Sequence, residues 1–201
     1  MKTSEMISFE EAEKKGVKIT RGWEINQEKG GLSIVNSSVN ARYDMVVISG
    51  EGFAYDTLVK TEHTAPAVVP YYQEGNKVYV GLIKHWRPVL KSWSWEIIRG
   101  FGDSGVSDEE NAVRELSEEW GSQGKLTKIG TFTANTGWDQ SGYVAWAAQL
   151  DPKEKENPQP EISEQIEARE WFEFPKALPE IICGITLSCL LKFSQQAEKL
   201  S

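Results

Sequence analysis

The sequence predicts a protein of mixed α and β structure, either an α+β protein or one built on a mixed sheet. Three observations predict this fold class. Segments rich in β-branched and aromatic residues lie both before and after one well-capped central helix. A second, amphipathic helix is predicted near the C-terminus. No series of strand–helix–strand units with a glycine-rich turn is present, which argues against a dinucleotide-binding domain.

The segment 1–62 predicts a small β-rich region that begins with a short helix. Residues 8–15 predict the helix, because a serine at their start can cap its first turn. The segments Asp44–Ser49 and Phe53–Lys60 predict two strands by their β-branched and aromatic content. The glycines between them predict a turn.

A β-hairpin is predicted next. The segments Val68–Tyr72 and Val78–Ile83 read as strands, and the five residues 73–77 between them include Gly-Asn, which suits a hairpin loop. Pro70 lacks a backbone N–H, so the first strand is expected to have an unpaired position there.

The segment Ser107–Glu119 carries the strongest helix signal. Ser107 and Glu110 form an S-x-x-E capping box, and the first turn is acidic, as the helix dipole favours. Gly121 can end the helix in a left-handed conformation. The 3.6-residue period predicts a buried stripe made of Val113, Leu116 and Trp120.

The remaining chain predicts more strands and a final helix. The segments Ile129–Ala134, Tyr143–Leu150 and Ile166–Phe174 read as strands. A charged loop with prolines covers 151–161. The last element, about 186–199, reads as an amphipathic helix.

Composition limits the possible function. The chain has 201 residues and a net charge of −8, which disfavours nucleic acid and anionic membranes as partners. Neither a targeting segment nor an apolar stretch of membrane-spanning length is found. Cys183 and Cys189 give no disulfide framework, and we expect both to pack as small apolar residues. These features predict a soluble protein in the reducing cytoplasm.

Three carboxylates share one side of the predicted helix. Glu115 lies three and four residues before Glu118 and Glu119, so all three can point the same way. Arg114 is the one cation close enough to offset their repulsion. A solvated acidic surface would explain the charges alone. A divalent cation would also explain them, because Mg²⁺ binds carboxylate oxygens together with water and substrate phosphate.

The stretch from Gly100 to Gly121 resembles the Nudix box, G-x5-E-x7-R-E-U-x-E-E-x-G-U, where U is a bulky aliphatic residue. Seven motif positions match in register: Gly100, Arg114, Glu115, Leu116, Glu118, Glu119 and Gly121. Val106 stands where the family has its first glutamate, and Ser122 stands where it has an aliphatic residue. Val106 removes a carboxylate that supports the site at the junction of loop and helix.

Outside the box the chain resembles the ADP-ribose pyrophosphatase branch of this family. The segments 84–88 and 95–100 are similar to the branch signature QYR…ELPAG. Arg87 and Glu96 match it, whereas three residues replace its Gln, Pro and Ala: His85, Ile98 and Arg99. Weaker similarity extends over about residues 40–195.

This resemblance implies a Nudix α/β/α sandwich with a mixed sheet, preceded by a small N-terminal antiparallel β region. The implied domains are an extension, 1–62, that forms a homodimer and a Nudix hydrolase domain, 63–201. The implied activity is Mg²⁺-dependent hydrolysis of a nucleoside diphosphate derivative, with Mn²⁺ as a substitute. The leading substrates are ADP-ribose, which would give AMP and ribose 5-phosphate, and ADP-sugars.

The resemblance also implies metal ligands. Three helix carboxylates and one backbone carbonyl would bind the metal: those of Glu115, Glu118 and Glu119, and that of Arg99. Glu164 would act as the base or orient water, with Glu161 and Glu167 as rivals. Gly100, Arg114 and Gly121 would have structural roles.

The substrate contacts keep alternatives open. Arg87 is either a phosphate ligand or a surface cation, since arginine suits bidentate contact with phosphate. Glu96 either positions the substrate or forms a buried pair with an arginine. Arg99 is either a second phosphate contact or a local partner for acids. Trp138 either stacks on the adenine base or belongs to the core or a dimer interface.

Two other functions remain as alternatives. Val106 favours a Nudix-fold module that senses a ligand without cleaving it. The other alternative is a Nudix hydrolase of a different nucleotide substrate.

Overall fold

The computed structural model describes nine stretches of the chain: residues 18–21, 43–50, 53–60, 64–87, 90–103, 105–136, 142–153, 157–159 and 165–197. The chain divides into two compact units, of which one comprises 1–61 with 135–140 and the other 62–134 with 141–201. Each unit is described by itself below. Within the described residues, every helix is too short or too polar to span a bilayer.

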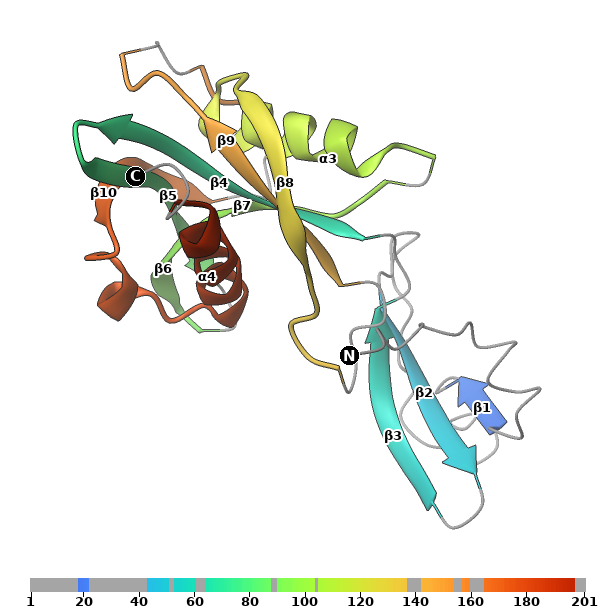
Figure 1. The fold of residues 1–201 in the computed structure, drawn as a ribbon. Helices are drawn as coiled ribbons and strands as arrows, with labels where there is room; N and C mark the ends of the chain where they lie inside the picture. The colour runs from blue at the N-terminus through green and yellow to red at the C-terminus, as the bar shows by residue number, and fades with distance from the viewer. Residues whose placement is uncertain are drawn as a thin grey trace. The chain divides into compact units, whose positions relative to one another are not determined.

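The first unit contains a three-stranded antiparallel sheet (Figure 1). Its strands follow the order β1 (Lys18–Arg21), β2 (Tyr43–Gly50) and β3 (Phe53–Lys60). The two strands predicted in this region are therefore confirmed. The predicted helix over 8–15 lies outside the described residues.

A seven-stranded mixed sheet forms the centre of the second unit. Its strands are β4 (Ala65–Glu74), β5 (Lys77–Arg87), β6 (Ser92–Glu96), β7 (Ile98–Arg99), β8 (Lys125–Phe132), β9 (Tyr143–Gln149) and β10 (Ile166–Phe174). The main order is β10-β5-β4-β9-β8, while β6 pairs with β5 and β7 with β4. Only the β4–β9 pairing is parallel among these strands.

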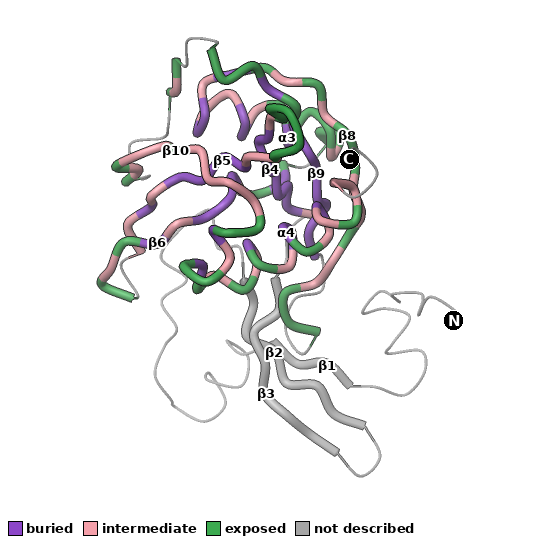
Figure 2. Tube along the Cα trace, turned by 60° about the vertical axis from the view of Figure 1, so that its left-hand side comes forward, coloured by how far each residue is buried: buried purple, intermediate pink, exposed green. Residues whose placement is uncertain are grey.

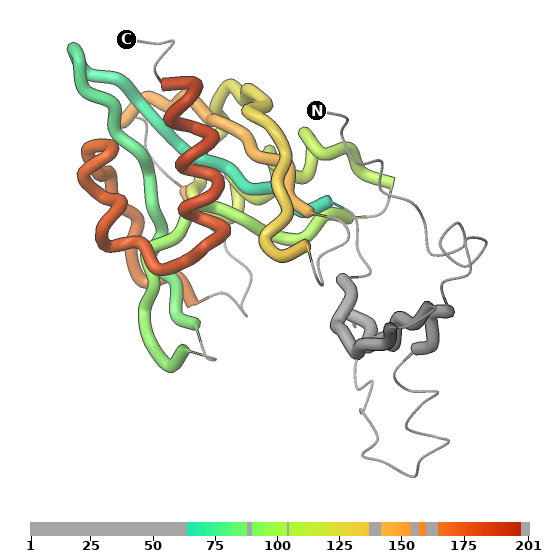
Figure 3. Tube along the Cα trace, turned by 60° about the horizontal axis from the view of Figure 1, so that its bottom comes forward, coloured from blue at the N-terminus to red at the C-terminus, as the bar shows by residue number. Residues whose placement is uncertain are grey.

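Helices cover both faces of this sheet. The helical elements are α3 (Asp108–Glu115), the π-helical turn η1 (Leu116–Trp120), the 3₁₀ turn η2 (Leu178–Glu180) and α4 (Gly184–Ala197). α3 and α4 lie on opposite sides of the sheet (Figures 1 and 3). The predicted α/β/α sandwich with a mixed sheet is therefore confirmed.

Two hydrophobic clusters fill the sandwich, one on each face of the sheet. Because side chains alternate along a strand, Ala67 and Val69 of β4 belong to the cluster on the α4 side, and Val68 belongs to the cluster on the α3 side. Buried residues concentrate in β4, β5 and β9 (Figure 2).

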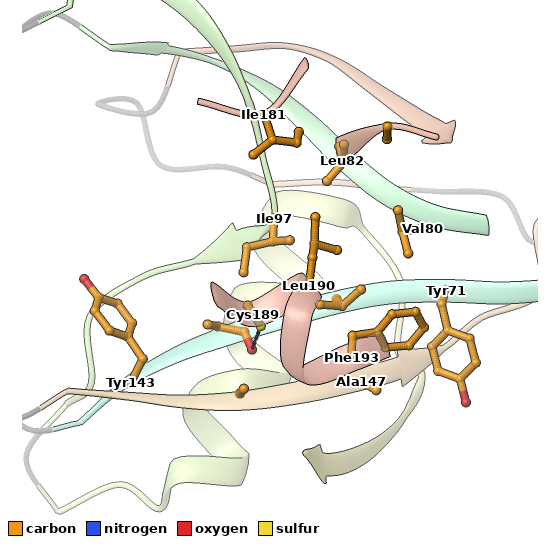
Figure 4. Packing of buried hydrophobic residues seen from close by; sticks show 14 of the residues in the cluster. Tyr71, Val80, Leu82, Ile97, Tyr143, Ala147, Ile181, Cys189, Leu190 and Phe193 are labelled. Atoms are coloured by element: carbon orange, nitrogen blue, oxygen red, sulfur yellow. Dashed lines mark hydrogen bonds between the residues drawn. The ribbon is translucent and has the colours of Figure 1, made fainter. Parts of the chain in front are cut away.

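The cluster on the α4 side includes a tilted ring pair, in which the centroids of Tyr71 and Phe193 lie 5.1 Å apart (Figure 4). Cys189 packs in this cluster as predicted, and its thiol donates a hydrogen bond to the carbonyl oxygen of Ala67 at 3.7 Å. Burial raises the pKa of this thiol. Cys183 is only partly buried.

The predicted hairpin is confirmed, but the predicted loop length of five residues is wrong. Strand pairing continues to Glu74 and Lys77, which leaves a two-residue turn. Gly75 adopts a φ of 58°, a conformation that a glycine accepts without strain and that lets so short a turn reverse the chain. Pro70 lies where expected, because pairing with β5 begins only at Tyr71.

The predicted buried stripe is partly wrong. Leu116 and Trp120 are buried, but Val113 is exposed. The backbone hydrogen bond of the π-helical turn spans five residues in place of the four of an α-helix, so it shifts the phase of the residues beyond it. Trp120 consequently faces the sheet in line with Ala112 and Leu116, not with Val113.

Several element boundaries also differ from the prediction. β4 begins at Ala65, three residues before the predicted Val68, and β5 ends at Arg87, four residues beyond the predicted Ile83. β8 begins at Lys125, four residues before the predicted Ile129, and α4 begins at Gly184, two residues before the predicted start. β8 starts early in part because Lys125 pairs with Gln149 at the end of β9. Cross-strand pairing therefore extends this strand beyond its apolar residues.

Candidate active site

A line of buried polar residues runs along α3 and η1. Asn111, Glu115 and Glu119 are each less than 5% exposed, although two of them carry a carboxylate. They are spaced four residues apart, and the π-helical turn keeps the third in line with the other two. This polar face therefore extends to the end of the helix.

The helix begins and ends as the sequence predicts. The backbone N–H of Glu110 donates to Ser107 Oγ at 3.2 Å, and the N–H of Ser107 donates to Glu110 Oε2 at 3.0 Å. The capping box is therefore confirmed. At the other end Gly121 has a φ of 84°, and a Cβ atom there would overlap the backbone of Asn157 and Pro158.

Residues 157–159 close the C-terminal end of the helix. The N–H of Asn157 donates to the Gly121 carbonyl at 3.1 Å, and that of Gln159 donates to the Glu118 carbonyl at 2.9 Å. A further donor comes from β10, where Arg169 Nε donates to the carbonyl of Glu119. Carbonyls at a helix end lack partners within the helix, so these bonds hold the carboxylate-bearing turn in place.

Glu119 connects this turn to the end of β7. Its carboxylate oxygen Oε2 accepts a hydrogen bond from the backbone N–H of Arg99 at 3.1 Å. The next residue, Gly100, lies against the carboxylate of Glu115, because a Cβ atom there would overlap it. A residue with a side chain would therefore not fit at position 100 unless the carboxylate of Glu115 moved.

Arg114 contacts the carboxylates from the exposed side. Its Nη1 donates to Glu118 Oε2 at 2.9 Å, and its Nη2 lies 2.8 Å from Glu115 Oε1. Nη2 also donates to the carbonyl of Phe101 at 3.0 Å and lies 3.5 Å from Asp103 Oδ2. This guanidinium is thus surrounded by carboxylates of both the helix and the loop.

A second charged cluster joins residues of β5, β6 and β7. Glu96 is 2% exposed and binds two arginines: Arg87 through Nε at 2.9 Å and Nη2 at 2.6 Å, and Arg99 through Nε at 3.1 Å and Nη2 at 2.8 Å. Burial alone would raise the pKa of Glu96, but the hydrogen bond from Arg87 and the charge of Arg99 outweigh it and hold the pKa at about 2. Two guanidiniums against one carboxylate leave a net positive charge.

His85 and Ser94 lie beside this cluster. They are directly opposite each other in the β5–β6 pairing, and both are buried. Arg87 Nη1 lies 3.4 Å from His85 Nε2, which must act as the acceptor because an arginine can only donate. Burial and the charge of Arg87 lower the pKa of His85 to about 4. His85 Nδ1 and Ser94 Oγ have no hydrogen-bond partner among the described residues.

The structure brings most of the sequence-predicted site residues together in two linked groups. The first joins the helix to its preceding loop and contains Arg99, Gly100, Arg114, Glu115, Glu118, Glu119 and Gly121. The second contains Arg87, Glu96 and Arg99, so Arg99 belongs to both. The side chain of Glu96 forms the buried arginine pair that the sequence left open as one of its readings.

Among the other candidate positions, Trp138, Glu161, Glu164 and Glu167, the structure describes only Glu167. Trp138 and Glu164, with its rival Glu161, lie outside the described residues. The remaining rival, Glu167, forms an ion pair with Lys84 at 2.6 Å.

Two residues of the site were missed by the sequence reasoning. Asn111 lies four residues before Glu115, and this spacing places a polar group on the face of the motif carboxylates. Arg169 lies in the middle of a predicted strand, where a cation needs a specific partner. Both signals were present in the sequence.

A divalent cation such as Mg²⁺ requires oxygen ligands. The helix offers carboxylate oxygens, which are the ligands that Mg²⁺ and Mn²⁺ prefer. Among the described residues, no three His, Cys, Asp or Glu side chains are already gathered at metal-binding geometry. Instead, Arg114 pairs with Glu115 and Glu118. The residues fit such a cation by their chemistry.

Known proteins share the fold of this chain. Solved structures with a similar fold include an ADP compounds hydrolase, which is 19% identical with a TM-score of 0.59, covering 82% of this chain and 91% of that chain. Another is the NUDIX domain of Shewanella oneidensis NrtR complexed with ADP ribose. It is 16% identical with a TM-score of 0.55, and the match covers 68% of this chain and 89% of that chain. A third is a C. elegans Ap4A hydrolase binary complex, which is 21% identical with a TM-score of 0.52, and the match covers 68% of this chain and 99% of that chain.

At these identities the three structures support the fold alone. None of the curated proteins matches the sequence significantly. The model of the NUDIX domain family matches residues 61–183, which is more than half of the chain and includes both charged groups of the site. The chain therefore belongs to the Nudix family.

Proposed function

We propose that this protein is a metal-dependent pyrophosphohydrolase that cleaves a nucleoside diphosphate derivative, with ADP-ribose or an ADP-sugar as the substrate. One observation carries the proposal. The motif carboxylates Glu115 and Glu119 are buried against the loop at Arg99 and Gly100, next to a cluster with a net positive charge. Acidic oxygens for a cation therefore lie beside arginines suited to phosphate.

The helix residues would hold the metal. Glu115, Glu118 and Glu119 would bind Mg²⁺ or Mn²⁺ with the backbone carbonyl of Arg99, and Glu115 and Glu118 would release Arg114 to do so. When bound, such cations neutralise the pyrophosphate and lower the pKa of the attacking water.

The other predicted residues would act on the substrate. Arg87 and Arg99 would bind the diphosphate, while Glu96 fixes the direction of both guanidiniums. Trp138 would stack on the adenine. Glu164 would accept a proton from the attacking water.

A second candidate function is a module that binds the same kind of ligand without cleaving it. Val106 in place of the motif glutamate favours this candidate, and one structure of similar fold is a NUDIX domain complexed with ADP ribose. A hydrolase of another nucleotide is a third, and a C. elegans Ap4A hydrolase shares the fold. The three retained helix carboxylates, those of Glu115, Glu118 and Glu119, favour the first proposal over the second.

We further propose that the segment 1–62 forms a homodimer. It contains the three-stranded sheet of β1, β2 and β3, which supplies strands that a second copy can extend or cover. Light scattering of the full chain and of a variant lacking these residues tests this, with a dimer expected only for the full chain.

A substrate panel tests the proposed function. Purified protein is incubated with ADP-ribose, ADP-glucose, NADH, diadenosine polyphosphate and dATP, with and without Mg²⁺ or Mn²⁺, and the products are separated by HPLC. The proposal expects AMP from ADP-ribose or ADP-glucose only with metal. Calorimetric binding of one compound without turnover would favour the non-cleaving module. Turnover confined to the last two compounds would favour the third candidate.

A further inference from the structure

The junction between loop and helix lacks the negative charge that the motif glutamate would supply, because residue 106 is a valine. It stands at the position of the first glutamate of the Nudix box, and its side chain is exposed. Its backbone N–H donates to the carbonyl oxygen of Asp103 at 3.4 Å. A valine side chain can contribute neither charge nor hydrogen bond, so any carboxylate at this junction must come from another residue.

Asp103 brings a carboxylate to the motif arginine from the loop. Its Oδ2 lies 3.5 Å from Arg114 Nη2, the same nitrogen that contacts Glu115 from the helix side. The carbonyl of Phe101 accepts from this nitrogen as well. The guanidinium is therefore held between the loop and the helix, with acids on both sides.

The position of Asp103 is fixed by a buried residue. Its backbone N–H donates to Asn111 Oδ1 at 3.2 Å. The amide nitrogen of Asn111 in turn donates to the carbonyls of Ser107 at 3.2 Å and Val106 at 3.5 Å. Asn111 is 2% exposed, so these bonds form away from water and connect the loop to the first turns of α3.

Asp108 is the other acid near this junction, and its contacts differ. Its Oδ2 lies 3.8 Å from Lys128 Nζ on β8. It also belongs to the acidic first turn of α3, where the helix dipole favours a negative charge. The described contacts therefore assign Asp108 to the start of the helix and Asp103 to Arg114.

We propose that Asp103 replaces the missing motif glutamate as the loop carboxylate that positions Arg114, and through it Glu115 and Glu118. Asp103 is a positioning residue, because it acts through Arg114 and not on the substrate. The inference rests on the proposed metal-dependent function, since its consequence is better-oriented metal ligands. This role of Asp103 also explains why the other six charged or glycine positions of the motif are retained although residue 106 is a valine.

The test measures metal binding by the full chain without substrate. Mn²⁺ alone is titrated calorimetrically into the wild type, Asp103→Asn, Val106→Glu and the double variant. Asp108→Asn is the matched control, because it removes the same charge five residues away. Circular dichroism and the melting temperature in EDTA establish that each variant is folded.

Loss of a residue that orients metal ligands weakens metal affinity roughly 10–100-fold. We expect Asp103→Asn to weaken Mn²⁺ binding about tenfold within that range. Asp108→Asn should leave the affinity within about twofold of the wild type, because Asp108 does not contact Arg114. Val106→Glu alone should change it little, because Asp103 already supplies a carboxylate to Arg114. In the Asp103→Asn background, Val106→Glu should restore most of the loss, since a glutamate there can contact Arg114 from the same loop.

Three results overturn the inference while leaving the proposed function intact. One is wild-type affinity in Asp103→Asn, and another is an equal loss in Asp108→Asn. Failure of Val106→Glu to restore binding in a folded double variant also contradicts it. Absence of Mn²⁺ binding by the wild type would contradict the proposed function itself, and is distinguishable because it appears before any substitution is made.

Discussion

The carboxylate of Glu115 lies in the space that a side chain on Gly100 would occupy. The two residues are fifteen positions apart, one in the loop after β7 and the other at the end of α3. This contact buries Glu115 and ties the helix to the end of β7, where the N–H of Arg99 also donates to Glu119. The spacing of the motif glycine and glutamate thus has a direct spatial cause.

Substituting Gly100 by alanine tests this contact. The new Cβ would push the Glu115 carboxylate aside, and a displacement of about 1 Å at a catalytic group can lower activity roughly 100-fold. We expect a loss of this order in kcat/KM for ADP-ribose. Gly184→Ala is the control, because no atom lies within 4 Å of its Cβ position. Equal activity in both variants would show that kcat/KM does not depend on the observed position of the Glu115 carboxylate.

The Glu96 cluster predicts a pH dependence of stability. The folded protein holds the pKa of Glu96 at about 2, against its ordinary value of 4.5. A carboxylate with a depressed pKa stabilises the folded state above pH 4.5, and this contribution is lost as the pH falls toward 2. At 1.36 kcal/mol for each pKa unit, the contribution is about 3 kcal/mol.

Urea unfolding of the wild type and Glu96→Gln at a series of pH values measures this contribution. The variant should be less stable than the wild type near neutral pH, because Arg87 and Arg99 lose their charged partner. The difference should shrink between pH 4.5 and 2. A difference that stays constant over this window would mean that Glu96 is not the titrating group.

We expect the substitution Ser94→Ala to leave the free energy of unfolding almost unchanged. Its Oγ is buried without a hydrogen-bond partner among the described residues, so Ser94→Ala removes an unsatisfied group. Thr186 is the contrasting case, because its Oγ1 accepts from the N–H of Ile97 at 3.3 Å. Thr186→Val leaves that buried N–H unpaired and should cost about 1–3 kcal/mol. Thermal unfolding of Ser94→Ala and Thr186→Val compares their stability. An equal loss of stability in both variants would contradict the different hydrogen bonding of the two hydroxyls.

The sequence predicted the strands, the capping box and the helix end well, because these depend on local signals. Phe53–Lys60 and Ile166–Phe174 are strands with the predicted bounds. The Nudix box also located the carboxylates and their supporting glycines. Membership of the family then predicted the layers of the fold, which no single segment encodes.

Features that depend on tertiary contacts could not be predicted in this way. The π-helical turn Leu116–Trp120 is closed by a bond from the Gly121 N–H to the Leu116 carbonyl, and regular helical periodicity does not anticipate it. The role of Glu96 likewise depended on both arginines approaching it from different strands. The sequence could name these three residues but not decide between a substrate contact and a buried pair.

The most direct test of the account is the release of AMP from ADP-ribose by the wild type and by Glu119→Gln, each with and without Mg²⁺. Glutamine keeps the shape of the side chain and can still accept from the Arg99 N–H, but it removes the charge that a cation needs. We predict metal-dependent AMP release by the wild type and its loss, by at least about 100-fold, in the variant. Equal AMP release by both proteins, or release that does not require metal, would contradict it.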